Sequence, residues 1–505
     1  MPERDRLPLW QRLVQEVKRH RKYADADWAA PPEIVALLEG LVATSEPKSP
    51  EVRDQFLFNF GDHDFWETDD YEAEAIKFRE QHRRAIAELY PRIGLEGILA
   101  FAQEVAHPFD VGVALGTVDS DEPEKAFLPS SLRADEKVLA LVRGFIAARF
   151  EKRGLTWVDE LPLASWTPAD VGLFFSLLPF TQPVWEAAEK LLGEKATEYW
   201  QHIEVRPQGD STWLYQATEK LLQYDRGPSA LRAINSALYK EKSVPPELAI
   251  RAIKSFLRTF SDKHPHDVHD LRHVIKFLQS APDVDEKELG AIEWELLPVF
   301  DRFSGESAKT LERNLATHPS FFVDAIKGCY RGKGQPKPEA PEGDDKKKRF
   351  AERYYRLLHN WHSPPGSAKG RPFDPDALRK WIDEVRKLAE PTGHWEVAQS
   401  HIGNVIAYVP RDDDGLPMNR GAAAILDAND HDDMRRGYRI ELFNSRGVYN
   451  VAGGQADREK QKEYEERAKK MNDAGFTNIA ATLRSMAEEY GYSAERAEKS
   501  VDPDL

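Results

Sequence analysis

Apolar residues recur along most of this chain at the three- and four-residue spacing that places them on one face of a helix. The pattern is strongest between Thr167 and Phe260, for example at Val171, Phe174, Phe175 and Leu178. Each such stripe must be buried against a neighbouring element. Prolines at Pro183 and Pro245-Pro246 prevent one long rod. The spacing therefore predicts an all-α fold, a helical-repeat solenoid of the HEAT or TPR kind in which short helices stack as antiparallel pairs.

The chain is long enough to contain more than one packing unit. At 505 residues it exceeds what a single core usually organises. The clearest boundary is 331–349, where prolines are mixed with charges and little can be buried, which is typical of a mobile linker. We expect an N-terminal helical region (1–130), a central solenoid (131–330), this linker, and a C-terminal helical region (350–505).

Three helix starts are marked by their residue types. Thr167-Pro168 and Asp374-Pro375 each combine a side chain that can cap a helix with a proline, which the first helical position tolerates. Asp135-Glu136 places negative charge where the helix dipole favours it. These pairs predict helices that begin directly after Asp135, Thr167 and Asp374.

Near the C-terminus the apolar residues briefly alternate. Tyr438, Ile440 and Leu442 occupy every second position, and Val448 follows the polar stretch 444–447. Alternation on both sides of a turn predicts two short strands, so we expect a small β-hairpin in an otherwise helical chain. Two helices, over 457–471 and 477–490, are predicted to close the chain.

The turn of this hairpin is the best candidate for a recognition loop. Asn444, Arg446 and Tyr449 are the candidate binding residues, because polar side chains on an exposed turn can hydrogen-bond a partner. Asn444 and Arg446 could instead pair with Asp432 and Asp433. A hairpin tip that satisfies only its own backbone is the alternative.

Composition narrows the possible partners. The formal net charge of −16 argues against a dedicated surface for nucleic acid or for an anionic membrane. Cys329 is the only cysteine, so no disulfide can form within the chain. No apolar run approaches the roughly eighteen residues of a membrane span, and the segment Met1–Lys22 lacks the apolar stretch of a signal peptide. We expect a cytoplasmic protein with no membrane-spanning segment.

The one dense histidine cluster is His264, His266, His269 and His273. On a helix that begins near Asp267, His269 and His273 would share one face at a spacing that suits a metal ion. The residues between them lack the glutamate of a metallopeptidase helix. A solvated helix start is therefore the preferred interpretation, and a metal-dependent hydrolase is the alternative.

Motifs for other chemistry are missing from the sequence. The stretch 444–447 has the second half of a nucleophile elbow, but Phe443 stands where glycine is required. The sequence contains no G-x-x-x-x-G-K-[ST], no strand followed by G-x-G-x-x-G, and no C-x-x-C. We therefore predict no catalytic residue, no enzymatic activity and no cofactor.

Several short segments, taken together, resemble those of a known group of proteins. They are Gly94–Leu99, His107–Gly112, Leu177–Phe180 with Trp185, Tyr199-Trp200, Glu293-Trp294, Leu297-Pro298, His318–Phe322, Ile402-Gly403, Arg446–Val448 and Ala480–Arg484. Together they resemble the C-terminal helical-repeat region of large bacterial multidomain proteins that look like antiviral STAND NTPases and related defence proteins. The resemblance runs from about Tyr71 to Glu489.

This resemblance implies a sensor or scaffold. In such proteins the region would follow an effector domain and, where present, a nucleotide-binding domain. The present sequence has motifs of neither, which implies a separate subunit or a fragment. A concave solenoid surface would bind a protein, such as a phage component, an effector or an NTPase subunit. A general assembly scaffold unconnected with immunity is the remaining alternative.

Overall fold

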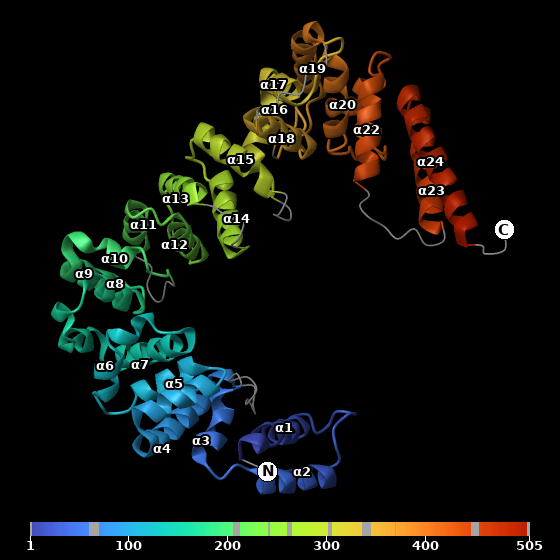
Figure 1. Cartoon of the computed structure of the whole chain (residues 1–505). Coiled ribbons are helices and arrows are strands. Elements are labelled where there is room, and N and C mark those ends of the chain that lie inside the picture. Colours follow the sequence, from blue (N-terminus) through green and yellow to red (C-terminus); the bar gives the residue numbers. More distant parts are fainter. Residues whose placement is uncertain are drawn as a thin grey trace. The chain divides into compact units, whose positions relative to one another are not determined.

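Every regular element that the structure describes is a helix (Figure 1). The computed structural model describes residues 3–59, 70–205, 213–240, 243–259, 265–300, 306–335, 345–368, 370–445 and 454–501. The predicted all-α class is confirmed for these residues. None of their helices combines the length and the apolar character needed to cross a bilayer.

The chain forms two compact units, Met1–Asp270 and Leu271–Leu505. The α-helices of the first unit are α1 (Glu3–Lys22), α2 (Pro32–Ser45), α3 (Pro50–Arg53), α4 (Tyr71–Glu104), α5 (Pro108–Gly116), α6 (Glu122–Phe127), α7 (Glu136–Glu160), α8 (Pro168–Ser176), α9 (Gln182–Leu192), α10 (Thr197–Trp200), α11 (Leu214–Gln223), α12 (Gly227–Tyr239) and α13 (Pro246–Thr259). The helix α14 (Pro265–Ser280) includes the boundary between the units.

The α-helices of the second unit are α15 (Glu286–Phe300), α16 (Lys309–Thr317), α17 (Pro319–Cys329), α18 (Asp345–His359), α19 (Pro375–Ala389), α20 (Trp395–Ile406), α21 (Arg420–Leu426), α22 (Asp432–Asn444), α23 (Gln455–Asp473) and α24 (Thr477–Val501). Short 3-10 helices are η1 (Asp54–Phe58), η3 (Ser130–Arg133), η4 (Leu163–Ser165), η5 (Gly193–Lys195) and η6 (Glu390–Thr392). The finer four-part division stays a prediction. Within it, α18 begins at Asp345, so residues 345–349 of the expected linker are helical, while 336–344 lie outside the described residues.

Within each unit the helices pack mainly against helices that are close to them in sequence. In the first unit α11 contacts α12, and α12 contacts α13. In the second unit α20 packs on α22, and α23 packs along α24 (Figure 1). Such local packing buries most of the apolar stripes of the described helices against helices that are near in sequence.

The three predicted helix starts are confirmed. The Asp135 carboxylate accepts hydrogen bonds from the first turn of α7, and the Thr167 hydroxyl accepts one from the Asp170 amide in α8. The Asp374 carboxylate does the same for α19, which begins at Pro375. Each cap satisfies amide groups that have no partner within their own helix.

Glycines bring two helices of the first unit into backbone contact. A Cβ atom at Gly112 of α5 would lie 1.9 Å from the carbonyl oxygen of Leu141 in α7, and one at Gly144 of α7 would lie 2.0 Å from that of Phe109 in α5. These distances leave no room for a side chain, so only glycine permits the approach. The register of α5 against α7 is therefore fixed, and with it the position of Phe109.

The second unit uses the same device. A Cβ atom at Gly403 of α20 would lie 1.9 Å from the carbonyl oxygen of Met434, and one at Gly437 of α22 would lie 1.9 Å from that of Ser400. In both units, therefore, a reciprocal pair of glycines joins two helices that belong to one local pair.

The predicted β-hairpin is wrong in its first half. Tyr438, Ile440 and Leu442 lie in α22, a helix of 13 residues. The reason is that burial follows a helical period rather than an alternating one: Met434 and Tyr438 are buried, whereas Ile440 is exposed. The second expected strand, around Val448, lies outside the described residues.

Candidate protein-binding groove

A groove lies on the first unit over α4, α5, α7 and the end of α8. It consists of two adjoining hollows. One, of about 630 Å³, is lined by α4 and by the α5–α7 pair. The other, of about 850 Å³, is lined by that pair, by Leu173 and the segment Ser176–Phe180, and by His202 and Glu204. Phe109, Ala147 and Glu151 line both hollows, which makes them one continuous surface.

Phe109 stands where the two hollows meet. Its side chain is 44% exposed, although Val111 and Leu115 of the same helix are buried. Its backbone is fixed because its carbonyl group packs on Gly144. An exposed aromatic ring on a fixed backbone is the kind of anchor that carries much of the binding energy in protein interfaces.

Three exposed cations border the groove, Arg79 from α4 and Arg143 and Lys152 from α7. None of them forms an ion pair with a carboxylate of the described residues. Arg83 in the same wall differs, since its guanidinium lies 2.7 Å from the Glu80 carboxylate. Positive charge is therefore available at both hollows.

The acidic side chains of the groove are mostly engaged. Glu204 interacts with Arg226, and Asp110 interacts with the ring of His82. Burial lowers the pKa of His82, whose ring accordingly stays neutral near pH 7. Glu151 is the exposed carboxylate shared by both hollows. A neutral His82 ring does not cancel the charge of Asp110, so Asp110 and Glu151 both count against the three cations that form no ion pair within the described residues. The remaining excess of positive charge favours a negatively charged partner.

The predicted recognition loop is described only at its beginning. Asn444 is the exposed last residue of α22, whereas Arg446 and Tyr449 lie outside the described residues. The expected pairing of Asn444 with Asp432 is wrong, because the two residues lie at opposite ends of α22, about 18 Å apart along its axis. Asp432 pairs instead with Arg435.

The two candidate metal ligands lie on one helix, as the spacing predicts. His269 and His273 are both in α14, and Nε2 of His269 lies 3.1 Å from the Tyr239 hydroxyl. His264 lies outside the described residues. Across the part of the chain that is described, no three His, Cys, Asp or Glu side chains are close enough together to hold a metal ion.

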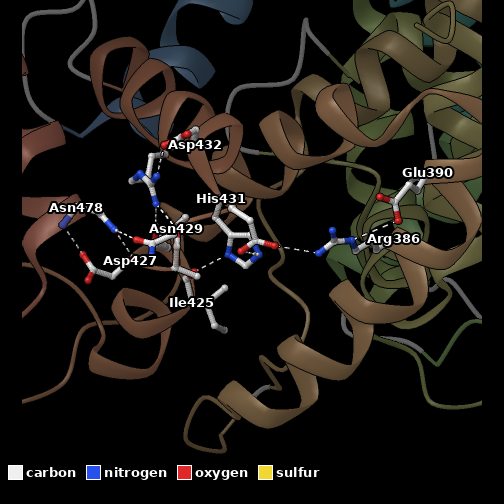
Figure 2. Close-up of polar contacts among 12 residues, drawn as sticks. Arg386, Glu390, Ile425, Asp427, Asn429, His431, Asp432 and Asn478 are labelled. Atoms are coloured by element: carbon white, nitrogen blue, oxygen red, sulfur yellow. Dashed lines mark hydrogen bonds and ion pairs between the residues drawn. The ribbon is translucent and has the colours of Figure 1, made fainter.

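A polar cluster in the second unit surrounds the loop between α21 and α22 (Figure 2). The Asp427 carboxylate accepts hydrogen bonds from the backbone amides of Asn478 and Ile479, at 2.7 and 3.0 Å. The side-chain amide of Asn478 donates to the Asp427 carbonyl oxygen at 2.6 Å. The loop therefore caps the first turn of α24.

Two arginines complete this cluster. Arg435 donates to the carbonyl oxygens of Leu426 and Ala428, at 2.7 and 2.6 Å. Arg386 of α19 pairs with Asp430 at 2.9 Å, and this bond lowers the pKa of the Asp430 carboxyl (Figure 2). Since these groups already satisfy one another, the cluster joins helices and leaves little for a ligand to bind.

Reasoning from the sequence missed the groove. Phe109 belongs to one of the segments that carry the family resemblance, but apolar periodicity alone does not show that its ring stays exposed. Arg143 and Lys152 read as ordinary charged positions of a surface helix. The available signal was Phe109 itself, an aromatic residue in the first turn of a helix and off its buried stripe.

The geometry of the groove is therefore the main evidence on function. Comparisons with protein-family models, with curated proteins and with solved structures found no match for this chain.

Proposed function

We propose that this chain is a non-enzymatic helical-repeat scaffold that binds a protein partner through the groove on α4, α5, α7 and α8. We further propose that its helix pairs stack as a solenoid and that, in line with the resemblance of its sequence, it acts as a sensor in bacterial antiviral defence. The observation that carries the proposal is the exposed Phe109 between two hollows, bordered by cations that form no ion pair within the described part of the chain.

An extended protein surface suits this groove better than a small metabolite does. The lining comes from four helices, from the segment that follows α8 and from His202 and Glu204 after α10, so a ligand must span a wide area to touch all of it. Small-molecule sites usually enclose most of the ligand surface and converge on a few polar groups. Stacked helix pairs instead supply extended area, with affinity concentrated in a few anchors.

The charges specify the kind of segment that would bind. An apolar side chain of the partner would pack on Phe109, and carboxylates flanking it would pair with Arg143 and Lys152 on one side and with Arg79 on the other. Such pairs fix orientation and speed association more than they add affinity. The expected ligand is therefore an acidic, amphipathic protein segment.

Affinity capture from phage-infected and uninfected bacteria tests this proposal. Phe109→Glu and Arg143→Glu are the test variants, and Lys125→Glu is the matched control, since Lys125 is exposed on α6 outside the groove. The Phe109 substitution should not disturb folding, because the side chain is exposed and a carboxylate is favourable in the first turn of a helix.

The expected result is that wild type and Lys125→Glu retain the same protein. Phe109→Glu should retain at least about tenfold less of it, because an interface anchor contributes over about 1.4 kcal/mol. Arg143→Glu should also retain less, because the reversed charge repels the carboxylates of the partner. Equal retention by all four proteins contradicts the groove. If deletion of the gene leaves phage plating unchanged, the role in defence is wrong, and a scaffold unconnected with immunity takes its place.

A further inference from the structure

Glu151 of α7 occupies the middle of the groove. It lines both hollows, together with Phe109 and Ala147. Its side chain is exposed, that of Ala147 is half-buried, and the Phe109 ring is 44% exposed. A protein segment that covers Phe109 therefore also covers the Glu151 carboxylate.

The neighbours of Glu151 on its own helix cannot neutralise this carboxylate. Ion pairs on a helix form between residues three or four positions apart. The residues at those positions from Glu151 are Ala147, Ala148, Gly154 and Leu155. The adjacent Lys152 points about 100° away around the helix axis, and Arg143 lies about 12 Å away along that axis. Glu151 accordingly forms no ion pair and no hydrogen bond through its side chain with any residue that the structure describes.

Other carboxylates of this region do have a cation at the helical spacing or nearby. Glu80 of α4, which lines one of the hollows, pairs with Arg83 and Arg84, at 2.7 and 2.9 Å. Glu160 at the end of α7 pairs with Arg153. The lack of such a cation at Glu151 is therefore a local feature of the groove and not the rule for this surface.

Covering Glu151 without a new partner is unfavourable. A carboxylate that loses its water and gains no cation carries a large desolvation cost. A segment that is entirely acidic and apolar would add repulsion to that cost. A segment with an arginine or lysine opposite Glu151 avoids both, so this carboxylate discriminates between the two kinds of segment.

We propose that Glu151 is a specificity-determining residue of the groove, and that it pairs with an arginine or lysine which the partner presents next to the side chain packed on Phe109. The inference rests on the proposed function and refines the ligand described there. That ligand stays acidic overall, but it carries one cation at its centre. Arginine suits this position best, since its planar group can pair with a carboxylate and stack on an aromatic ring.

The direction in which Glu151 variants change binding tests this inference. If Glu151 only repelled an acidic partner, Glu151→Gln would strengthen binding and Glu151→Lys would strengthen it further. If Glu151 pairs with a cation of the partner, both substitutions weaken binding. Glutamine and lysine are good helix formers and the position is exposed, so neither substitution should disturb α7.

Affinity capture from phage-infected cells measures the effect, with the retained protein quantified by mass spectrometry. The protein to follow is one that wild type retains and Phe109→Glu loses. Glu151→Gln should retain about tenfold less of it, and Glu151→Lys about a hundredfold less, because a lysine then faces the cation of the partner. Asp159→Lys should retain as much as wild type. It is the matched control, since Asp159 is exposed on the same helix outside the groove and the change in charge is the same. Matching melting temperatures show that all variants are folded.

Exchange of the two charges gives the stricter test. A photoreactive amino acid at position 109 identifies the segment of the retained protein that contacts the groove. The arginine or lysine nearest to the cross-linked residue is then replaced by glutamate. This variant should bind wild type about a hundredfold more weakly and should regain most of its affinity for Glu151→Lys.

The outcomes separate this inference from the proposed function. If a protein is retained through Phe109 but Glu151→Gln retains it equally well or better, the proposed function stands and the role of Glu151 is wrong. The role is also wrong if the exchanged pair binds no better than the two single variants. If wild type retains no protein that Phe109→Glu loses, the proposed function fails and this inference fails with it.

Discussion

Buried polar side chains in the second unit hold helix ends. Glu293 of α15 is fully buried, and its carboxylate accepts hydrogen bonds from the backbone amides of Thr310 and Leu311, at 3.2 and 2.9 Å. Gln279 donates to the same carboxylate at 2.8 Å. Because Ala308, at the N-cap position of α16, has no side chain that can cap, Glu293 supplies the cap from the neighbouring helix.

Replacement of Glu293 by alanine should therefore destabilise the protein. Two amides and the Gln279 side chain would lose their buried acceptor, which costs about 2–4 kcal/mol in the free energy of unfolding. Glu295→Ala on the same helix is the control, because the exposed Glu295–Arg353 pair contributes less than about 1 kcal/mol. Urea denaturation measures both, and equal effects would contradict this role of Glu293.

The buried His401 makes stability depend on pH. Burial lowers its pKa to about 4, Nε2 lies 3.0 Å from the Tyr330 hydroxyl, and Nδ1 has no partner among the described residues. The unfolded chain, with a histidine pKa near 6.5, binds the proton more readily. The contribution of neutral His401 is thus complete above pH 6.5 and is lost as the pH falls toward 4.

The variant His401→Phe should be less sensitive to acid. Between pH 7 and pH 5 the wild type should lose about 2 kcal/mol more of its free energy of unfolding than the variant, according to the linkage between pKa and stability. Urea denaturation at the two pH values measures this difference. Identical losses in both proteins would show that His401 does not bind a proton on unfolding in this range.

At the scale of single residues, the sequence predicts local caps and misses distant ones. Asp135, Thr167 and Asp374 cap the helices that they directly precede, so residue type and position suffice to identify them. Glu293 caps a helix that begins 16 residues later. Nothing local distinguishes it from Glu295, and only the fold shows which of the two is buried.

At the scale of elements, reciprocal glycines determine how two helix pairs pack. Gly112→Ala and Gly403→Ala should each cost at least about 2 kcal/mol in the free energy of unfolding, because the new methyl group would overlap a carbonyl oxygen of the partner helix. Gly290→Ala in α15 is the matched control. Its nearest contact would be at 3.6 Å, so the higher helix propensity of alanine should make it neutral or stabilising by up to about 1 kcal/mol.

Thermal denaturation of these three variants tests whether close backbone packing requires glycine at positions 112 and 403. If the Gly112→Ala or Gly403→Ala variant has the melting temperature of the wild type, the two helices can move apart at little cost in stability. A comparable loss in Gly290→Ala would show that glycine matters for another reason than close packing.

Part of this packing has a signature in the sequence. Pro108–Gly112 and Pro168–Gly172 share the pattern P-x-D-V-G, and in both the proline is the first helical residue. Both glycines lie against the backbone of another helix, Gly172 against Glu198. The hairpin prediction, in contrast, rested on a weak pattern in the sequence. An alternation over only three residues is too short to outweigh the helical period that Met434 and Tyr438 establish.

At the scale of the whole molecule, apolar periodicity predicts the all-α class but not which apolar residues stay exposed. Ile34, Leu37 and Leu41 of α2 follow the spacing of core residues, and only the fold shows that they are exposed. The division into two compact units at Asp270 also lacks a marker, because it falls inside α14. Binding surfaces therefore had to be found from burial and unpaired charge.

The groove as a protein-binding surface is the central claim, and site-specific photo-cross-linking in phage-infected cells tests it most directly. A photoreactive amino acid replaces Phe109 in one protein, Arg143 in a second and Lys125 in a third. The account predicts that positions 109 and 143 yield an adduct with the same protein and that position 125 does not. No adduct from either groove position, or the same adduct from all three, would contradict it.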